Sequence, residues 1–372
     1  MKNLLDSDLN RRDFLKLSMG SLAALGLSAL DIPGFTAALQ AAVAEIPVVW
    51  FLAGTCSGCS VSIVNTVSPN IKEILIDEVI PGVHLNVLYQ PVIMAGQGHQ
   101  VIEVLKEARD KGGFVLVVEG VVGTKDEGVY CRVGEENGKE KTALEWITEL
   151  GSSALLVLPI GACATYGGVP GSAPNVTGVK GVAEIFKERG VATPVVNIPG
   201  CPPHPDWFVG TVATALLVLS GGGGIPETVQ ALGGVDDYGR PKVFYGQLVH
   251  DHCERRADFD EGRFAKQFGE PGCLYELGCK GPVTYADCPA RRWNNKVSWC
   301  VGCGHGCIGC TEPIFVDGVS PLRARVSGVT LPGVRTNADR IGIGLAAATA
   351  VGIGAHLVGS AARGRLGKGA EE

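Results

Sequence analysis

The chain has 372 residues, which is long for one small domain, so we expect two domains with additional segments at the ends. Apolar residues make up 46% and charged residues 19%, which excludes a disordered chain and permits a sizeable core. Lys and Arg total 32 against 38 Asp and Glu, and this net charge of −6 provides no basic surface for nucleic acid. The thirteen cysteines cannot all pair in disulfides, so metal binding is the first hypothesis for them.

The N-terminal segment is typical of an export signal. Arg11 and Arg12 are followed by Asp-Phe-Leu-Lys and then by an uncharged run over residues 17–30. That run is too short to span a bilayer but suits the apolar part of a signal peptide. The paired arginines resemble the twin-arginine signal, and residues 42–44 form an Ala-Val-Ala cleavage site. We therefore predict a twin-arginine signal peptide over 1–44, with an ordinary amphipathic helix as the alternative.

The C-terminal segment has the composition of a membrane span. Residues 341–362 include no charged residue and would form a helix about 33 Å long, enough to cross the hydrocarbon core. Arg363, Arg365 and Lys368 follow the span, so the positive-inside rule predicts a cytoplasmic tail over 363–372. The globular part would then lie on the outer face of the membrane. A buried core helix is the alternative.

His356 lies inside this predicted span. An ionisable residue within a membrane helix is a candidate functional residue, and imidazole is a haem ligand. A neutral histidine that is hydrogen-bonded to another helix is the alternative, and the sequence leaves both open.

Between the two ends, continuously apolar runs alternate with helical patterns, which predicts a parallel α/β domain over residues 45–225. The clearest strand-like runs are 46–52, 114–118, 154–158 and 194–198. Three of them lead directly into cysteine motifs, which are Gly54-Thr-Cys56-Ser-Gly-Cys59, Gly161-Ala-Cys163 and Pro199-Gly-Cys201. Because the carboxyl ends of parallel strands meet at one edge of a sheet, these four cysteines are expected to converge.

Four convergent thiolates suit either zinc or a 4Fe-4S cluster. The set contains one C-x-x-C pair and two distant single cysteines, whereas zinc sites usually combine two close pairs, so iron–sulfur is favoured. The sequence has no G-x-G-x-x-G after the first strand and no Walker lysine, which gives nucleotide binding no support.

The strand–helix alternation ends after a glycine run at 221–224, which we interpret as a link between domains. Residues 226–320 contain little aliphatic sequence and many metal-ligand residue types. These are His250, Cys253, Cys273, Cys279, Cys288, Cys300, Cys303, Cys307 and Cys310. We expect bound clusters to hold this region together, with a disulfide-bonded domain as the alternative. Residues 321–340 would be a linker to the membrane span.

Five motifs together resemble the small subunit of membrane-bound NiFe-hydrogenases of the periplasmic uptake type. They are Cys56-Ser-Gly-Cys59-Ser, Gly161-Ala-Cys163-Ala-Thr-Tyr-Gly-Gly, Pro199-Gly-Cys201-Pro-Pro-His-Pro, Tyr275-Glu-Leu-Gly-Cys279-Lys-Gly-Pro and Cys307-Ile-Gly-Cys310-Thr-Glu-Pro. The resemblance covers essentially the whole chain. It implies a flavodoxin-like domain followed by a loop-rich cluster domain, with three iron–sulfur clusters in a row. The nickel–iron centre would belong to a separate large subunit, so this chain would carry no catalytic residue.

The resemblance also implies the ligands of two clusters. A proximal 4Fe-4S cluster would be held by Cys56, Cys59, Cys163 and Cys201, and a distal 4Fe-4S cluster by His250, Cys253, Cys273 and Cys279. His250, and not the nearby His252, has the family's His-x-x-Cys spacing. Because a neutral imidazole replaces a thiolate there, we expect the distal cluster to have a raised reduction potential.

The medial cluster departs from the commonest family pattern. The family usually supplies three cysteines, matched here by Cys288, Cys307 and Cys310, and has a proline after the tryptophan, which leaves a 3Fe-4S cluster. Here Trp299 is followed by Cys300, which resembles the NiFeSe-type branch. We therefore predict a medial 4Fe-4S cluster with Cys300 as fourth ligand, with Cys303 as the second candidate for that ligand. A 3Fe-4S cluster would follow if neither of them binds.

Four further residues carry smaller expectations. Cys131 remains as an unligated thiol. Gly58 and Gly168 occupy the positions where oxygen-tolerant relatives have two further cysteines, so we expect an ordinary proximal cluster and an enzyme that oxygen inactivates. Glu119 could belong to a proton route, although a surface or interface carboxylate is the simpler interpretation.

The resemblance implies a hydrogenase small chain that passes electrons from H₂ oxidation at the large subunit to a membrane cytochrome b and the quinone pool. It would lie on the periplasmic face of the cytoplasmic membrane. Without the membrane span, a periplasmic cytochrome c would be the expected acceptor. The alternatives are an iron–sulfur subunit of another membrane redox complex, related to the cluster subunit of complex I, and a structural zinc protein.

Overall fold

The computed structural model describes residues 47–67, 70–75, 86–220, 223–313, 315–316, 328–331 and 334–363. The chain forms two compact units, residues 1–322 and 323–372. The predicted signal peptide, its cleavage site and the tail after Arg363 lie outside the described residues, as does part of the glycine run at 221–224.

The parallel sheet predicted from the apolar runs lies at the centre of the first unit. Its strands, in spatial order, are β2 (Asn86–Tyr89), β1 (Pro47–Leu52), β3 (Val115–Glu119) and β7 (Leu156–Ile160). Val195 and Ile198 continue the sheet beyond β7 through two parallel bridges. The resulting order, 2-1-3-4-5, is the order of flavodoxin-like sheets, as expected.

The strands form where the sequence is continuously apolar and rich in β-branched residues, because both faces of the sheet are covered. Every residue of β3 and β7 is buried. Three of the four predicted runs lie in strands, whereas 194–198 makes only two isolated bridges. The sequence did not predict β2, in which Tyr89 is buried but the other three residues are partly or fully exposed.

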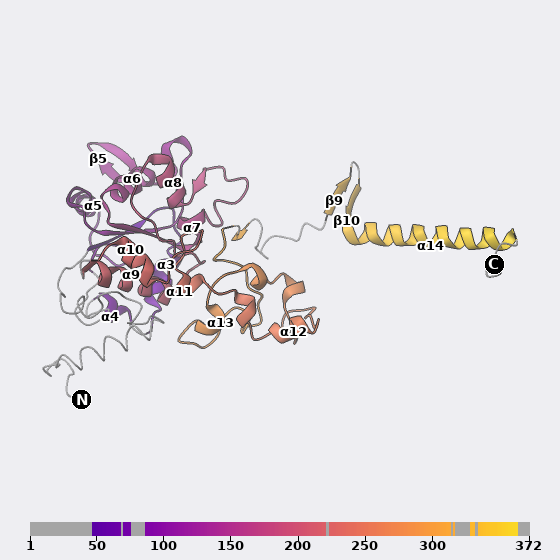
Figure 1. Ribbon diagram of the computed structural model, residues 1–372. Coiled ribbons are helices and arrows are strands. Elements are labelled where there is room, and N and C mark those ends of the chain that lie inside the picture. The colour runs from indigo at the N-terminus through magenta and orange to yellow at the C-terminus, as the bar shows by residue number, and fades with distance from the viewer. Residues whose placement is uncertain are drawn as a thin grey trace, which may run out of the picture. The chain divides into compact units, whose positions relative to one another are not determined.

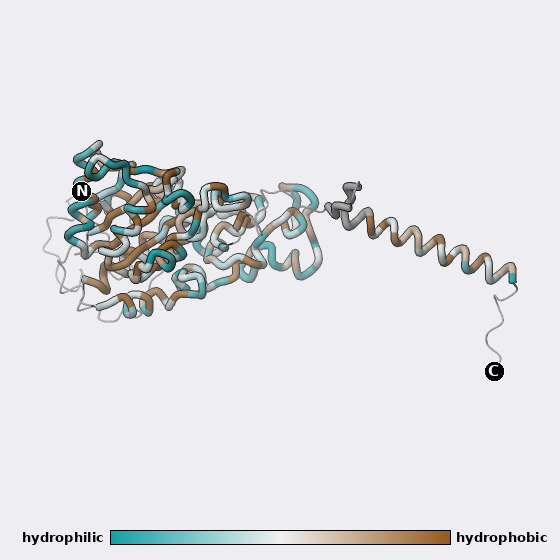
Figure 2. Tube along the Cα trace, turned by 90° about the horizontal axis from the view of Figure 1, so that it is seen from above, coloured by the Kyte–Doolittle hydropathy of each residue, from teal (hydrophilic) through white to brown (hydrophobic). Residues whose placement is uncertain are grey.

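Helices cover both faces of this sheet (Figure 1). One face carries α3 (Gly58–Val64), α9 (Pro205–Ser220) and α10 (Ile225–Ala231), and the other carries α5 (His99–Lys111), α6 (Ala143–Ser153) and α8 (Val182–Arg189). Alternate strand residues enter different clusters: Val117 packs in the cluster that contains α9, and Leu116 in the one that contains α5 and α6. Figure 2 shows the hydrophobic residues concentrated along these inner elements.

Short elements complete the first unit. Those in its first half are α4 (Ile71–Leu75), β4 (Val122–Gly123), η3 (Lys125–Gly128), β5 (Arg132–Glu136), β6 (Lys139–Thr142), α7 (Gly161–Tyr166) and β8 (Val179–Lys180). Those in its second half are α11 (Lys242–Tyr245), η4 (Val249–His252), α12 (Arg256–Asp260), η5 (Tyr275–Leu277), η6 (Gly281–Val283) and α13 (Cys288–Arg291). The second half is therefore rich in loops, as expected from its composition.

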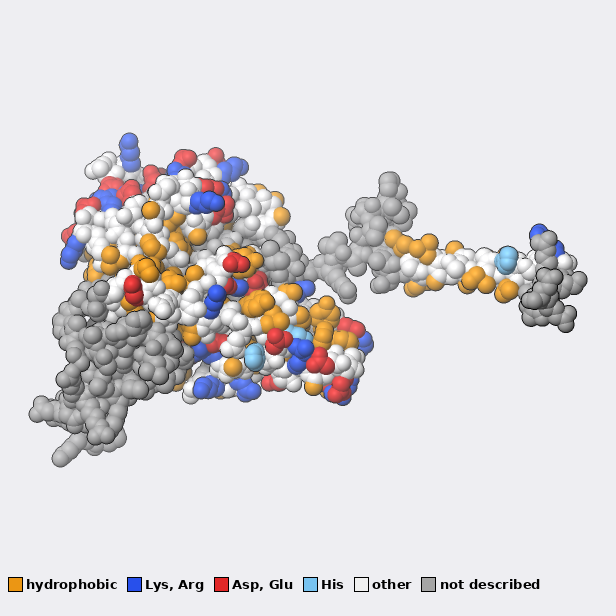
Figure 3. Space-filling view, in the orientation of Figure 1, with side chains coloured by type: hydrophobic (Ala, Val, Ile, Leu, Met, Phe, Trp, Pro, Cys, Tyr) orange, Lys and Arg blue, Asp and Glu red, His pale blue; other side chains and the backbone are white. Residues whose placement is uncertain are grey.

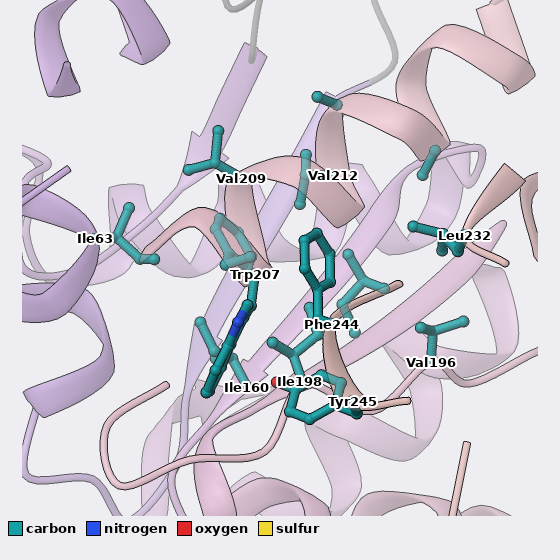
Figure 4. Packing of buried hydrophobic residues seen from close by; sticks show 14 of the residues in the cluster. Ile63, Ile160, Val196, Ile198, Trp207, Val209, Val212, Leu232, Phe244 and Tyr245 are labelled. Carbon is teal, nitrogen blue, oxygen red and sulfur yellow. The ribbon is translucent and has the colours of Figure 1, made fainter. Parts of the chain in front are cut away.

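The cluster on the α9 side of the sheet centres on aromatic side chains (Figure 4). The rings of Trp207 and Tyr245 have centroids 4.9 Å apart, and Phe244 lies beside them. The same cluster continues to Trp299 and Val301. The hydrophobic core therefore extends from the sheet into residues 226–320. The domain boundary at 225 stays a prediction.

The second unit contains a hairpin and one long helix. Strands β9 (Gly328–Leu331) and β10 (Val334–Asn337) pair in antiparallel fashion, and α14 (Ala338–Ala362) follows directly. The segment that the sequence predicted as a linker thus contains a hairpin, and the helix begins three residues before the predicted span. Within the described residues, one helix segment is long and apolar enough to cross a membrane, and it covers the predicted residues 341–362.

Candidate metal centres

The first cysteine group lies at the carboxyl edge of the sheet, as the strand order requires. Cys56 follows β1, Cys59 lies in the first turn of α3, Cys163 lies in α7 directly after β7, and Cys201 follows the bridge at Ile198. Gly161 lets two of these segments meet, because a Cβ atom at this residue would lie 2.5 Å from the Cys59 Sγ. Its φ of +86° also favours glycine.

Electrostatics shows that these four thiols are close neighbours. Burial raises the pKa of Cys59 far above its ordinary value, and Glu119, Cys163, Cys56 and Cys201 raise it further. Burial also raises the pKa of Cys163 to about 11, with contributions from Cys201 and Cys56. Such thiols lose their protons when a bound cation compensates the charge, so this is chemically a site for metal.

The second group surrounds a small cavity in the loop-rich half. His250, Cys253, Cys273 and Cys279 all line this cavity, together with Trp299 and Val301. Burial raises the pKa values of Cys253 and Cys273, and the thiol of Cys279 adds to both shifts. The four residues that the sequence assigned to a distal cluster are therefore brought together.

His250 is the most informative member of this group. It is 8% exposed, and its Nε2 is buried without a hydrogen-bond partner in the part of the chain that the structure describes. Burial lowers the pKa of His250, which favours the neutral ring with a free lone pair. His252, in contrast, is exposed. A buried ring nitrogen that lacks a partner fits a metal ligand.

The third group brings Cys288, Cys300, Cys307 and Cys310 together. Burial raises the pKa of Cys288 well above its ordinary value, and the other three thiols raise it further. Burial also raises the pKa of Cys307 to about 12, with a contribution from Cys300. Cys300 likewise raises the pKa of Cys310, whose shift is also mainly due to burial. Cys300 and Cys303 are both exposed, and Cys303 acts on the pKa of Cys300.

The three groups are neighbours in space. Cys201, in the first group, acts on the pKa of Cys310, in the third, and Cys310 packs against the hydrophobic cluster that contains Ala162, the residue before Cys163. The backbone N–H of Cys307, also in the third group, donates to the Cys279 Sγ of the second group over 3.2 Å. The third group therefore lies between the other two.

Within the described residues, no three His, Cys, Asp or Glu side chains lie close enough together to share one metal ion. The thiols of each group are nevertheless near enough to shift one another's pKa values.

Comparisons with known proteins agree with this geometry. The family model for the C-terminal part of the NiFe/NiFeSe hydrogenase small subunit matches residues 245–323, and that of the NADH ubiquinone oxidoreductase 20 Kd subunit matches residues 56–215. The periplasmic [NiFeSe] hydrogenase small subunit of Desulfomicrobium baculatum is 42% identical over 321 residues, covering 84% of this chain and 98% of that protein.

The quinone-reactive Ni/Fe-hydrogenase small chain of Wolinella succinogenes is 36% identical over 366 residues, covering 95% of this chain and 96% of that protein. The solved structure of H₂-activated Dm. baculatum [NiFeSe]-hydrogenase matches with a TM-score of 0.69 and 42% identity, over 75% of this chain and 98% of that chain. The chain belongs to the NiFe hydrogenase small subunit family.

This membership confirms the resemblance found in the sequence motifs. Members of the family are electron-transfer subunits of hydrogenases, carry iron–sulfur clusters and pair with a large subunit that holds the nickel–iron centre. The match of residues 56–215 to the complex I family covers only the sheet half, whereas identity to hydrogenase small subunits runs through both halves.

One expectation about the hydrogenase small chain is wrong. Glu119 is not a surface carboxylate: it is fully buried and accepts hydrogen bonds from Trp50, Thr55 and Ser60. Its place at the end of a continuously apolar strand was the available signal, because a charge there must be paired or hydrogen-bonded.

The structure also places the two glycines, the unassigned cysteine and the membrane-span histidine that the sequence singled out. A Cβ atom at Gly58 would be 3.2 Å from the Cys56 Sγ, and one at Gly168 would be 2.9 Å from the Cys163 Sγ, so both glycines border the first group. Cys131 packs against the α5–α6 side of the core, and burial raises the pKa of its thiol. His356 lies in α14 and is exposed within its unit.

Sequence reasoning missed Arg240, which joins the loop of Cys310 to residues 236–240, a segment that Asn197 at the sheet edge contacts by donating to the Tyr238 carbonyl over 2.7 Å. Its side chain is 2% exposed and forms ion pairs with Asp236 (2.6 Å) and Glu312 (2.9 Å). It also donates to the backbone carbonyl of Thr311 over 2.9 Å. Nothing in the local sequence of Arg240 marks it, because its partners are up to 72 residues away.

Proposed function

We propose that this hydrogenase small subunit relays electrons, released from H₂ at the large subunit, through three iron–sulfur clusters in the order proximal, medial, distal. The observation that carries the proposal is the adjacency of the three cysteine groups, with Cys310 packed against the cluster of Ala162 at one junction and the Cys307 N–H to Cys279 Sγ hydrogen bond at the other. Each cluster, when bound, accepts and releases one electron at a time without breaking a bond.

The proposed ligands are the residues of the three groups. The proximal 4Fe-4S cluster takes Cys56, Cys59, Cys163 and Cys201; the medial 4Fe-4S cluster takes Cys288, Cys300, Cys307 and Cys310; the distal 4Fe-4S cluster takes His250, Cys253, Cys273 and Cys279. Cys300 is preferred to Cys303 because it raises the pKa values of all three other medial thiols. The neutral ring of His250 removes one negative charge from the distal site, which favours electrons arriving there.

We further propose that the large subunit packs over the surface beside the proximal group. Cys56 and Cys201 are exposed in the isolated chain, and so are Val61, Val64 and Val67 on and just after α3. Thiolate ligands next to exposed apolar side chains are typical of an interface, because a partner then excludes water from both. Figure 3 shows hydrophobic side chains gathered on the visible face of the first unit.

The second unit supports a membrane role. In α14, large apolar side chains such as Ile343, Val351 and Val358 are about 70% exposed, which suits contact with lipid. We propose that α14 anchors the protein on the periplasmic face after twin-arginine export. The acceptor would be a membrane cytochrome b and the quinone pool, with His356 as a candidate haem contact. The relative in W. succinogenes is named quinone-reactive, and several others are named periplasmic or uptake hydrogenases.

The test is iron and acid-labile sulfide analysis of the purified heterodimer, combined with EPR of its oxidised and reduced states. We expect about twelve irons per small subunit beyond those of the large subunit, and no oxidised 3Fe-4S signal. About eleven irons together with an oxidised 3Fe-4S signal would still support the relay but would show that Cys300 is not a ligand. Zinc in place of iron would overturn the proposal.

The anchor is tested separately by fractionation of cells that produce the full chain or a chain ending at residue 327. We expect the full chain in the membrane fraction and the shortened chain, with its three clusters, in the soluble periplasmic fraction. A full-length chain that is soluble without detergent would contradict the anchor while leaving the relay untouched.

A further inference from the structure

Glu119 makes an unusual set of contacts for a carboxylate at the end of a buried strand. Its side chain has no exposed surface. Oε1 accepts from the Thr55 hydroxyl (3.1 Å) and from the Ser60 backbone N–H (3.3 Å). Oε2 accepts from the Trp50 indole N–H (3.0 Å) and from the Ser60 hydroxyl (2.5 Å). Four hydrogen bonds therefore converge on one side chain.

All four of these hydrogen bonds can be donated to Glu119. The indole and backbone N–H groups can only donate. The Thr55 hydroxyl accepts from the Ser57 N–H (2.9 Å), and the Ser60 hydroxyl accepts from the Gln90 amide (2.8 Å), so the proton of each hydroxyl is free to point at Glu119. Four donors around two oxygens match the four acceptor sites of a carboxylate.

The same contacts hold the loop that carries Cys56 and Cys59. Thr55 immediately precedes Cys56, and Ser60 immediately follows Cys59, so Glu119 is hydrogen-bonded to both ends of the C-x-x-C segment. The backbone after Glu119 also lies very close to this loop: a Cβ atom at Gly120 would be 2.8 Å from the Gly54 carbonyl oxygen. At this residue a φ of +95° favours glycine as well.

We propose that Glu119 is a positioning residue for the proximal cluster and that its fixed negative charge lowers the reduction potential of that cluster. The inference rests on the proposed function, because it requires a cluster on Cys56 and Cys59. Adding one electron to the site adds one negative charge, with no bond formed and no proton moved. A buried carboxylate next to the ligands opposes that charge.

The carboxylate of Glu119 lies within hydrogen-bonding distance of the residues on either side of the Cys56–Cys59 segment, so its charge is close to the proposed cluster. A lowered proximal potential would hasten the passage of each electron onward to the medial site and would disfavour its return.

The test is an EPR-monitored redox titration of the purified heterodimer, comparing wild type with Glu119→Gln and Glu119→Asp. The Gln variant keeps the size but removes the charge, and we expect a more positive proximal potential with unchanged medial and distal potentials. The Asp variant keeps the charge but, being one methylene shorter, places it farther from the cysteine loop. We therefore expect a smaller positive shift of the proximal potential. Glu127→Gln is the control, because Glu127 is an exposed carboxylate on η3 and should shift nothing.

The outcomes separate this inference from the proposed function. A wild-type heterodimer without a proximal signal would overturn the proposed relay itself. A full iron content with an unchanged proximal potential in Glu119→Gln would overturn the role of Glu119 while the relay stands. If the Gln variant fails to retain iron, the Asp variant is the deciding test. A positive shift of its proximal potential would support the role of the charge, whereas an unchanged or more negative proximal potential would overturn it.

Discussion

The proximal site and the other two sites are built in different ways. The proximal cysteines lie at the ends of buried strands and in the helices that follow, so the hydrophobic sheet fixes their positions. The medial and distal ligands lie between residues 246 and 313, a fully described stretch whose longest helix, α12, has five residues. There, hydrogen bonds to thiols and carbonyls replace regular structure, as in the Cys307 N–H to Cys279 Sγ contact.

This difference shows which parts of the fold depend on metal. A sheet with two covered faces is stable through apolar burial, whether or not a cluster binds at its edge. Buried thiols crowded together in loops repel one another once they are ionised, so that region needs the positive charge of iron. We expect the two halves of the first unit to respond differently when iron is removed or a contact is lost.

The largest expected effect follows iron removal. When the purified heterodimer is treated with an iron chelator under reducing, anaerobic conditions, hydrogen exchange should rise by orders of magnitude in peptides from 246–313. Peptides from β3 and β7 should keep most of their protection. Equal loss of protection in both regions would show that the sheet depends on the clusters as much as the loops do.

The second effect concerns the junction between the halves. Arg240→Met leaves the buried carboxylate of Glu312 and the partly buried carboxylate of Asp236 without their cation, which should destabilise the structure by about 3 kcal/mol. We expect faster hydrogen exchange at residues 311–313 and a weaker medial cluster signal, with the proximal signal retained. Arg256→Met, which breaks only exposed ion pairs, is the control for a lost arginine. An unchanged medial signal in Arg240→Met would mean that the Cys310 loop is held by its cluster alone.

The third effect distinguishes two neighbouring cysteines within the loop-rich half. Cys300→Ser should cost about one iron per small subunit and produce an oxidised 3Fe-4S EPR signal, because three thiolates remain at the medial site. Cys303→Ser, the matched control, should keep the iron content and the spectrum of the wild type. The reverse result would assign the fourth medial ligand to Cys303.

The sequence predicted the sheet half of the molecule well and the loop half less completely. Continuous apolar runs identified β1, β3 and β7, and the topology of parallel strands then brought four cysteines to one edge. The half-exposed strand β2 gave no such signal, since its side chains are mixed. In the loop half, no periodicity places residues, so ligand assignments came from motif resemblance. Only the structure shows which of these residues lie near one another, as His250 and Cys253 do around one cavity.

Buried polar groups with distant partners were beyond reach of the sequence. The partners of Glu119 are 59 to 69 residues away, and Glu312 is 72 residues from Arg240. Their hydrogen bonds depend on how strands and loops meet in three dimensions, which no local pattern records. Both residues nonetheless hold loops that carry cluster ligands: Glu119 bonds to the residues beside Cys56 and Cys59, and Arg240 bonds to the residue after Cys310.

The smallest effect concerns His204, a second junction between the halves. Its ring accepts from the Asp206 N–H at Nδ1 (3.1 Å), and its Nε2 lies 2.7 Å from the Arg292 carbonyl, so that Nε2–H donates there. Burial lowers the pKa of His204 below its ordinary value of 6.5, and the folded state therefore favours the neutral ring.

Because the folded pKa of His204 is depressed, its contribution to stability is present above about pH 6.5 and is lost as the pH falls through the lower folded value. One proton changes the free energy of unfolding by at most about 1.4 kcal/mol per pH unit. We expect the thermal midpoint of the heterodimer to fall less steeply with acidification in His204→Gln than in wild type, whereas His99→Gln, at an exposed histidine of α5, should follow the wild type. Identical slopes in all three proteins would show that His204 does not contribute to the acid response.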